Sequence, residues 1–382
     1  MPIAGITRIL LWGIAGSLSF VTLLLSPTQH QNATPPVKKT SAAVVVQPIA
    51  TTTQTVATTT AATATSTPKT TKIAPSKTKA AAVASTPTPI TPPAPVVPVE
   101  SFTDINTAAR GAIVNIICTT VQGGLLNPIS ASGVIIDPRG IVLTNAHVGQ
   151  YLLLKDYPFI GNISCILRMG SPAQPKYTVE LMYLPPAWIT ANAKQINATD
   201  PTGTGENDYA FLHITGVINP QTMTLPTSFP FLPISYDDPK LGENILVAGY
   251  PAGFLGGITI AMSLYSTSTI VPIATLYTFD VGTIDLVSLG ASIAAQKGVS
   301  GGAAVNQYGQ LIGVEATASE ATNTADRDLR AITIGHIDRS LTKERGVGLS
   351  SLLAADPSLF AQTYQLTIAP TLTRQLIDAI GH

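Results

Sequence analysis

The segment that begins at Ser101 predicts an all-β fold, either a barrel or a sandwich. Its apolar runs are short, rich in Val, Ile and Thr, and separated by Gly and Pro turn signals. Short strand-like runs at regular spacing are typical of these two architectures. The runs lie in residues 112–121, 131–148, 209–217, 243–253, 257–265, 303–316 and 330–337.

Turn and helix signals divide this segment further. Asp137-Pro138-Arg139-Gly140 has the residue types of a type I turn, with Pro second and Gly fourth. Residues 306–309 (NQYG) carry a similar hairpin signal. Helices are expected near residues 103–109 and at residues 371–380, where the second of them follows Pro370.

The N-terminus carries an uncharged apolar run of 17 residues, residues 9–25, behind Arg8. This length is at the lower edge for crossing a bilayer and slightly long for the core of a signal peptide. Because no clear cleavage signal follows Leu25, we expect an uncleaved apolar helix that anchors the chain in a membrane. The alternative is a cleaved signal peptide and a secreted or periplasmic protein. Both place the remainder outside the cytoplasm.

Residues 27–99 are dominated by Thr, Ala, Pro and Ser and have neither helical nor strand periodicity. Such a composition buries too little apolar surface to offset the entropy lost on ordering, which predicts a disordered linker. The expected organisation is therefore a signal anchor or signal peptide in residues 1–26, the linker in 27–99 and a folded domain in 100–382.

The charges are unevenly distributed along a chain whose net charge is zero. No Asp or Glu precedes Glu100, and seven of the 21 bases do, so residues 100–382 carry a net charge of −7. An acidic domain repels nucleic acid, which argues against DNA or RNA as a partner. The sequence contains no Cys/His cluster and no HExxH motif, so we expect neither a metal nor another cofactor.

Three local patterns carry residues that are suited to nucleophilic catalysis: TNAHV with His147, NDYAFL with Asp208, and GVSGG with Ser300. A serine hydroxyl is a poor nucleophile until a neutral imidazole accepts its proton, and a buried carboxylate holds that imidazole in the correct tautomer. Glycines beside the serine let the N–H groups of Gly298 and Ser300 point into one space as an oxyanion hole. We therefore expect His147, Asp208 and Ser300 to form a catalytic triad.

Other residues of the same types are rivals for these roles. His213 and His336 are alternative bases, but His213 interrupts an alternating strand and His336 follows the expected nucleophile. Asp200 and Glu206 are alternative carboxylates, and both lie in a polar loop away from the apolar strand that would hold the acid in place.

The segment from about Ser101 to Ile337 resembles a chymotrypsin-fold (trypsin-like) serine protease, most of all the bacterial Do-like (HtrA) type. SGVIIDPRGIVLTNAHV resembles the strands that deliver the family's histidine, and NDYAFLHI resembles the segment with its aspartate. GVSGGAAV resembles the nucleophile loop, and LGENILVAGYPAG the first strand of the second barrel. The resemblance implies two six-stranded antiparallel β-barrels, polypeptide substrates and serine endopeptidase activity. The 46 residues after His336 are too few for the PDZ domain that Do-like members commonly append.

The resemblance also implies which residues contact the substrate. The base of the primary specificity pocket falls at Ala294, beside Ala295, and the strand edge that pairs with the substrate backbone falls at Ala316-Thr317-Ala318. These small apolar residues imply a preference for a small or medium aliphatic side chain before the scissile bond.

The two cysteines, Cys118 and Cys165, are candidates for a disulfide. The expected compartment is oxidising and the count is even, and the family's first barrel places its first and fourth strands side by side. Two buried free thiols are the alternative.

The function that we expect is peptide-bond hydrolysis in extracytoplasmic protein processing or quality control. A stalked surface binding module on a catalytically idle protease scaffold is the alternative from another class, and a hydrolase of small esters is a third. No feature of the sequence predicts the oligomeric state.

Overall fold

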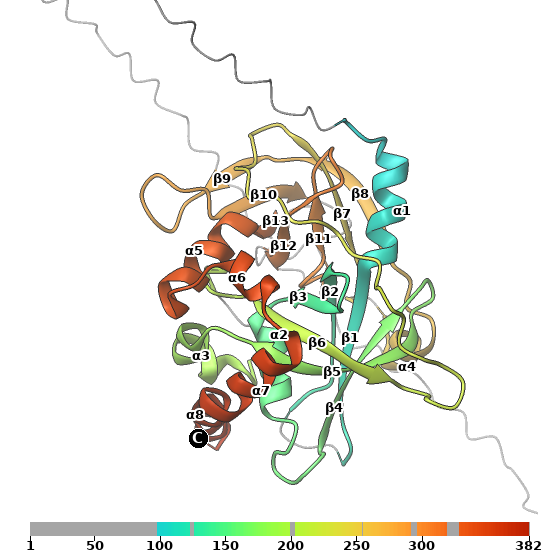
Figure 1. The fold of residues 1–382 in the computed structure, drawn as a ribbon, viewed down its shortest axis with the longest axis vertical. Helices are drawn as coiled ribbons and strands as arrows, with labels where there is room; N and C mark the ends of the chain where they lie inside the picture. Colours follow the sequence, from blue (N-terminus) through green and yellow to red (C-terminus); the bar gives the residue numbers. More distant parts are fainter. Residues whose placement is uncertain are drawn as a thin grey trace, which may run out of the picture. The chain divides into compact units, whose positions relative to one another are not determined.

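The computed structural model describes residues 98–122, 126–198, 203–253, 255–291, 296–318 and 328–381. All of them belong to the compact unit Pro89–His382 (Figure 1). The expected apolar helix at residues 9–25, and the expected linker except for its last two residues, lie outside the described residues. Among the helices in these ranges, none has the length and hydropathy needed to cross a bilayer.

Six antiparallel strands close into a barrel in the order β1-β2-β3-β6-β5-β4. The predicted turn at Asp137 joins two of them, with the N–H of Gly140 bonded to the Asp137 carbonyl at 3.0 Å and Gly140 at φ +88°. The strands are β1 Ile113–Thr120, β2 Ile129–Asp137, β3 Ile141–Thr144, β4 Ile163–Met169, β5 Gln174–Tyr183 and β6 Ala210–Val217.

Seven further strands form a second antiparallel sheet in the order β8-β7-β11-β12-β13-β10-β9. The two β units confirm the fold class, but the second differs from the expected closed six-stranded barrel. β8 ends at Pro272, whose nitrogen has no hydrogen to donate to a ladder, and β9 has only three residues. The strands are β7 Asn244–Gly249, β8 Thr267–Pro272, β9 Thr275–Tyr277, β10 Leu286–Ala291, β11 Ala303–Val305, β12 Leu311–Ala318 and β13 Asp328–Thr333.

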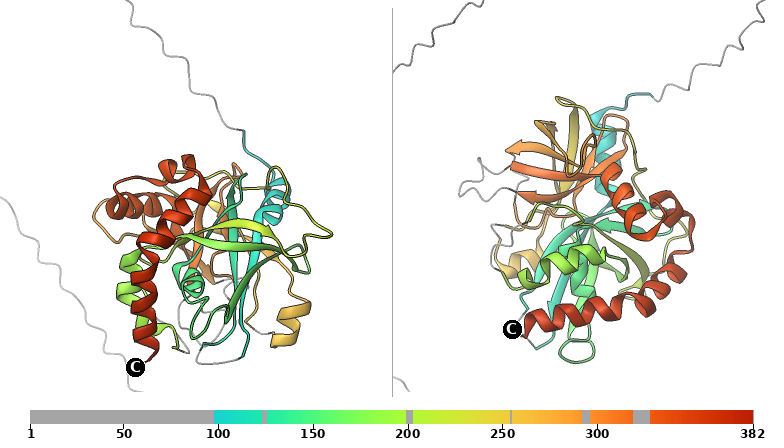
Figure 2. Two further views of the ribbon diagram at one scale, coloured as in Figure 1. Left: turned by 60° about the horizontal axis from the view of Figure 1, so that its bottom comes forward. Right: turned by 90° about the vertical axis from the view of Figure 1, so that its left-hand side faces the viewer.

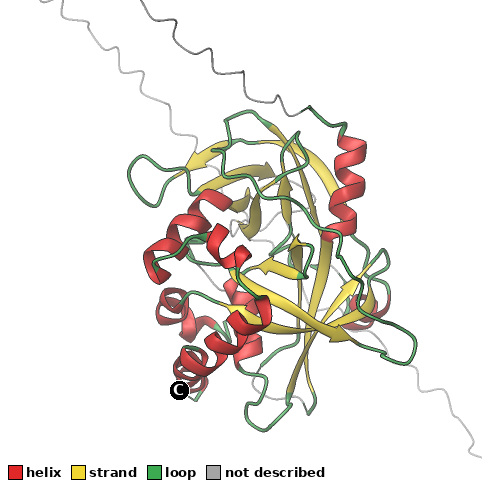
Figure 3. Cartoon of the chain, in the orientation of Figure 1, coloured by secondary structure: helices red, strands yellow, loops and turns green. Residues whose placement is uncertain are grey.

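The described helices surround these strands, with α1 on one side and α5 to α8 on the other (Figures 1 and 3). Figure 2 shows α8 alongside α3, with which it makes contact. The helices are α1 Phe102–Ala112, α2 Ala146–Leu153, α3 Pro186–Asn192, α4 Gly257–Met262, α5 Ile334–Arg345, α6 Leu349–Ala354, α7 Pro357–Thr367 and α8 Ala369–Ile380, and a short 3₁₀ helix covers Ala193–Gln195.

Four helices, α4 to α7, contradict or extend the expectations from sequence. Residues 257–265 were expected to form a strand, but α4 occupies most of that run. The expected strand at 330–337 ends at Thr333, whose hydroxyl accepts a hydrogen bond from the N–H of His336 and begins α5. The structure therefore has four C-terminal helices, α5 to α8, where only the last was predicted. Asp356, which caps α7 ahead of Pro357, is a helix-start signal that was missed.

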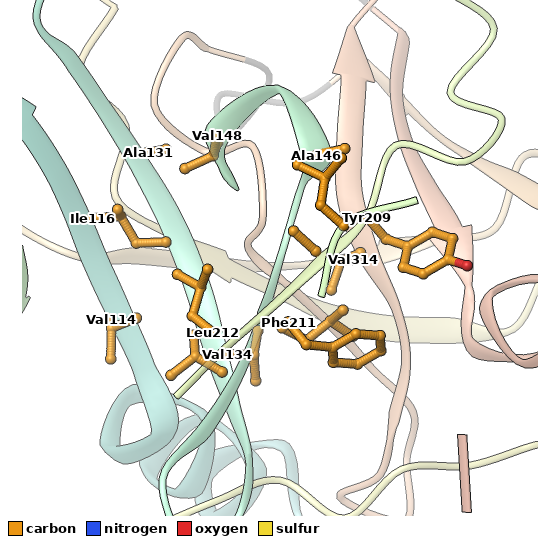
Figure 4. Close-up of a cluster of buried hydrophobic side chains, with 14 of the residues drawn as sticks. Val114, Ile116, Ala131, Val134, Ala146, Val148, Tyr209, Phe211, Leu212 and Val314 are labelled. Atoms are coloured by element: carbon orange, nitrogen blue, oxygen red, sulfur yellow. The ribbon is translucent and has the colours of Figure 1, made fainter. Parts of the chain in front are cut away.

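One hydrophobic core extends through the barrel and into the second sheet. Figure 4 shows part of it, with Val114, Val134 and Leu212 of the barrel and Val314 of β12 in one cluster. A separate cluster of buried apolar residues in the second sheet includes Val247 of β7 and Ala304 of β11. The shared core fixes the two β units against each other, which matters because the candidate site draws residues from both.

Cys118 of β1 and Cys165 of β4 are direct partners in the β1–β4 ladder. A disulfide joins them in the structure. The bond ties the first strand of the barrel to the strand that closes it.

Candidate active site

His147 and Asp208 are brought together by adjacent strands of the barrel. His147 is the second residue of α2, which follows β3. Asp208 lies just before β6, the strand that pairs with β3. The Nδ1 atom of His147 lies 2.9 Å from Oδ2 of Asp208. The backbone N–H of His147 donates to the other carboxylate oxygen, also at 2.9 Å. Asp208 therefore holds both the ring and the main chain of His147.

The carboxylate also controls the charge of the imidazole. Burial opposes the charged imidazolium, but the neighbouring Asp208 carboxylate outweighs it and raises the pKa of His147 above its ordinary value. The Asp208 side chain is almost fully buried, whereas about a third of the His147 side chain is exposed. A carboxylate with this geometry directs the imidazole proton to Nδ1 and leaves Nε2 as a proton acceptor.

Gly298 holds a backbone conformation that other residues rarely adopt, with φ of +100°. A Cβ here would lie 2.7 Å from the Tyr250 carbonyl oxygen and 2.8 Å from the Ala252 nitrogen, so only glycine fits. The Lys297 carbonyl, in the same peptide unit as the Gly298 N–H, accepts a hydrogen bond from Ala252 at 2.7 Å. Because the N–H and C=O of a trans peptide point in opposite directions, the Gly298 N–H is directed away from Ala252.

The N–H of Ser300 is oriented in the same way. It shares a peptide unit with the Val299 carbonyl, which accepts a hydrogen bond from the Gly302 N–H at 2.7 Å. Within the described residues, the N–H groups of Gly298 and Ser300 have no hydrogen-bond partner. Two oriented donors on either side of Val299 are therefore available to an approaching oxyanion.

Ser132 of β2 connects the barrel to this loop and was not predicted from the sequence. Its hydroxyl donates to the Gly298 carbonyl at 2.8 Å and accepts from the Tyr250 N–H at 2.9 Å. Its N–H donates to the Ser300 carbonyl at 2.8 Å, and its carbonyl accepts from the Thr144 hydroxyl at 2.7 Å. The one signal for this role in the sequence is a serine within an apolar strand, and the structure shows that its side chain is fully buried.

The structure places Ser300 on a loop that touches the histidine-bearing strand. A Cβ on Gly301 would overlap the Ser132 carbonyl oxygen and the Thr144 hydroxyl, and Thr144 lies three residues before His147. Among the described side chains, Ser300 Oγ and His147 Nε2 do not form a hydrogen bond. Such bonds are often long before substrate binds.

The rival residues have other partners. His213 is paired with Glu180 at 3.2 Å. His336 is paired with Asp285 at 3.0 Å, and burial lowers its pKa in spite of that carboxylate. Glu206 lies on the loop before Asp208, and Asp200 lies outside the described residues.

The expected substrate-contacting residues are described only in part. Ala294 and Ala295 lie outside the described residues. Ala316, Thr317 and Ala318 end β12, and the last two are paired with β13 on one side. On the other side, the β11–β12 ladder stops at Val314, and two further bonds join Glu315 to the glycines that follow Ser300. From Ala316 onward, β11 therefore does not pair with that edge of β12.

Glu315 is an unexpected buried carboxyl behind the nucleophile loop. It is fully buried, and within the described residues neither side-chain oxygen has a hydrogen-bond partner. A Cβ on Gly302 would lie 3.1 Å from its carboxyl carbon. Burial raises the pKa of Glu315 well above the ordinary value of a glutamate. The residue therefore binds a proton more tightly in the folded than in the unfolded chain.

This buried carboxyl predicts a loss of stability as the pH rises. Above the unfolded pKa of about 4.3 the unfolded chain releases the proton while the folded chain retains it, so the free energy of unfolding falls by up to about 1.4 kcal/mol per pH unit. Glu315→Leu should remove this dependence and make the protein more stable than the wild type at pH 8. Urea unfolding between pH 5 and pH 8 measures it. Glu100→Leu, which changes an exposed carboxyl, is the control, and parallel curves for the wild type and Glu315→Leu would contradict the assignment.

Comparisons with known proteins find one matching domain family and similar solved structures. The family model of the trypsin-like peptidase domain matches residues 131–314, a range that contains His147, Asp208 and Ser300. Among solved structures, the crystal structure of the serine endoprotease from Yersinia pestis is similar, with a TM-score of 0.40 and 22% sequence identity, and the match covers 67% of each chain. No curated protein sequence matches the chain. The trypsin-like peptidase domain match together with the two β units identifies the chain as a chymotrypsin-fold serine endopeptidase.

Proposed function

We propose that His147, Asp208 and Ser300 are the catalytic triad of this endopeptidase. The observation that carries the proposal is the pair of 2.9 Å contacts through which Asp208 holds the ring and the backbone of His147. The Ser300 hydroxyl attacks the carbonyl carbon of the scissile peptide while Nε2 of His147 takes its proton. The N–H groups of Gly298 and Ser300 stabilise the negative charge that develops on the carbonyl oxygen.

The same histidine completes the reaction. It returns the proton to the leaving amine as the C–N bond breaks, which leaves an acyl group on Ser300. Water, deprotonated by His147, then attacks the ester and restores the serine. The substrates are polypeptides whose backbone pairs with β12 at Ala316–Ala318, on the edge that β11 leaves unpaired, and a small or medium aliphatic side chain precedes the scissile bond.

Labelling with a fluorophosphonate probe tests the proposal. The full chain should react at one serine and hydrolyse casein, and Ser300→Ala should abolish both while it leaves the thermal unfolding temperature unchanged. Ser288→Ala, which alters a buried serine of the second sheet, should still be labelled. Labelling of the Ser300→Ala protein would contradict the assignment, and failure of the wild type to react would favour an idle scaffold that only binds its partners.

We also propose that the protein acts outside the cytoplasm, in protein processing or quality control, and is anchored in a membrane by residues 9–25. The support is the sequence of residues 1–99, whose apolar run precedes a linker without an acidic residue. The protein should remain with the membrane fraction after a carbonate wash and should begin near Met1. A mature N-terminus within residues 26–40 would instead identify a cleaved signal peptide.

A further inference from the structure

The loop that presents Asp208 has a backbone conformation that needs support. Asn207, the residue before Asp208, has φ of +60° and is the one non-glycine residue with positive φ in the described ranges. This left-handed conformation costs roughly 1–2 kcal/mol for a residue with a side chain, although asparagine tolerates it better than most. Local bonds from Asp208 N–H to the Gly205 carbonyl and from Tyr209 N–H to the Asn207 carbonyl tighten the loop.

A single hydroxyl from a distant helix holds both neighbours of Asp208. Ser340 on α5 donates a hydrogen bond to Oδ1 of Asn207 at 2.7 Å. It accepts one from the Tyr209 hydroxyl at 3.0 Å. Ser340 is buried, as is Tyr209. The carboxylate that contacts His147 is therefore carried by a residue whose two chain neighbours are tied to the same point.

The surroundings of these side chains determine which hydroxyl donates in the two hydrogen bonds from Tyr209 through Ser340 to Asn207. Burial raises the pKa of Tyr209 above its ordinary value, so its hydroxyl stays protonated and donates to Ser340. The Ser340 hydrogen is then directed to Asn207, whose Oδ1 has no hydrogen to give. Figure 4 shows the Tyr209 hydroxyl pointing away from the apolar cluster that contains Val314 and Phe211, and its ring packs at 5.9 Å from that of Phe211.

The helix that carries Ser340 is itself fixed in position. Asp285, whose side chain is almost fully buried, contacts His336 at 3.0 Å and Arg339 at 2.7 Å, both on α5. Ile337 and Leu341 of the same helix are fully buried in the core. The second sheet thus holds α5, and α5 in turn holds the Asp208 loop.

We propose that Ser340 is a positioning residue, which keeps the Asp208 carboxylate aligned with His147 by tying Asn207 and Tyr209 to α5. The proposal rests on the function proposed above. Loss of the hydroxyl removes a side-chain hydrogen bond from both neighbours of Asp208 at once, whereas the pairing of β3, which precedes His147, with β6 remains. A displacement of about 1 Å in a catalytic group can cost about 10²-fold in rate.

Kinetics and a spectroscopic signal test this role. Ser340→Ala should lower kcat by about 10- to 100-fold with little change in KM. Because Asp208 then raises the pKa of His147 less, the acidic limb of the pH–rate profile should move to lower pH. The NMR resonance of the proton between His147 and Asp208 should broaden or shift. Ser340→Thr restores the hydroxyl and should recover most of kcat, and Ser351→Ala, at an exposed serine of α6, should behave as the wild type.

The outcomes separate this role from a structural one and from the triad itself. A lower unfolding temperature with unchanged kcat, pH profile and NMR signal would overturn the proposal while the triad stands. Full activity of Ser300→Ala would overturn the triad. If Ser340→Ala does not fold, Tyr209→Phe removes the donated bond and keeps the ring, and it should produce a smaller change of the same kind. Wild-type kinetics in that variant would overturn the proposal.

Discussion

Replacing Asp208 by asparagine is expected to lower kcat by about 10⁴-fold without unfolding the protein. The asparagine amide can present an N–H to Nδ1 of His147, which moves the ring proton to Nε2 and leaves no acceptor for the serine proton. Turnover of a fluorogenic peptide by Asp208→Asn measures the effect. Asp238→Asn, at an exposed carboxylate, is the matched control and should retain full activity.

The same variant should alter the pH dependence. Asp208 raises the pKa of His147, and the neutral imidazole is the base, so wild-type activity should rise with pH through that elevated pKa. Without the carboxylate the pKa falls, and the acidic limb of the residual activity should move to lower pH. A near-wild-type kcat with an unmoved acidic limb would show that Asp208 is not the partner of the catalytic base.

Gly301→Ala is expected to destabilise the protein by more than about 4 kcal/mol and to prevent labelling of Ser300. The added Cβ would overlap the Ser132 carbonyl oxygen and the Thr144 hydroxyl. Neither atom can move freely, because the carbonyl oxygen belongs to the backbone of β2 and the Thr144 hydroxyl donates a hydrogen bond to that oxygen. Relief of the overlap would separate the nucleophile loop from the barrel.

Gly161→Ala provides a matched control for this variant. Gly161 also has positive φ, at +73°, but a Cβ there meets no atom within 4 Å. It should therefore lose only the roughly 1–2 kcal/mol of left-handed strain and keep full probe labelling. Urea unfolding of both variants measures the difference. Equal losses of stability would show that backbone strain alone, and not the contact with β2, explains the need for glycine at position 301.

The local parts of the candidate site were predictable because each depends on a short stretch of chain. Turn chemistry at Asp137–Gly140 predicts where β2 and β3 meet, and the apolar run after Asp208 predicts the strand that holds it. The glycines at 298 and 301 indicate a tight loop already in the sequence. The structure gives them φ values of +100° and +85°, which suit no other residue type well.

Some local predictions were wrong because short apolar runs suit both a strand and a helix. Residues 330–337 read as one strand, but the Thr333 hydroxyl caps a helix that begins at the next residue. The run at 257–265 has the composition of a strand, yet Gly257–Met262 are helical. Packing rather than composition decides between the two, and the buried positions Ile334, Ile337 and Leu341 of α5 follow helical spacing.

By itself the sequence determined the β class of the domain and the order of the histidine, aspartate and serine motifs, since strand periodicity and turn residues act over a few positions. Only the tertiary structure decided what holds these motifs in place. Ser132 bonds to Gly298 from 166 residues away, and Ser340 reaches Tyr209 across 131 residues. A serine hydroxyl carries no sequence signal for a partner at that distance, because the partner is set by how the two β units and α5 pack around the shared core.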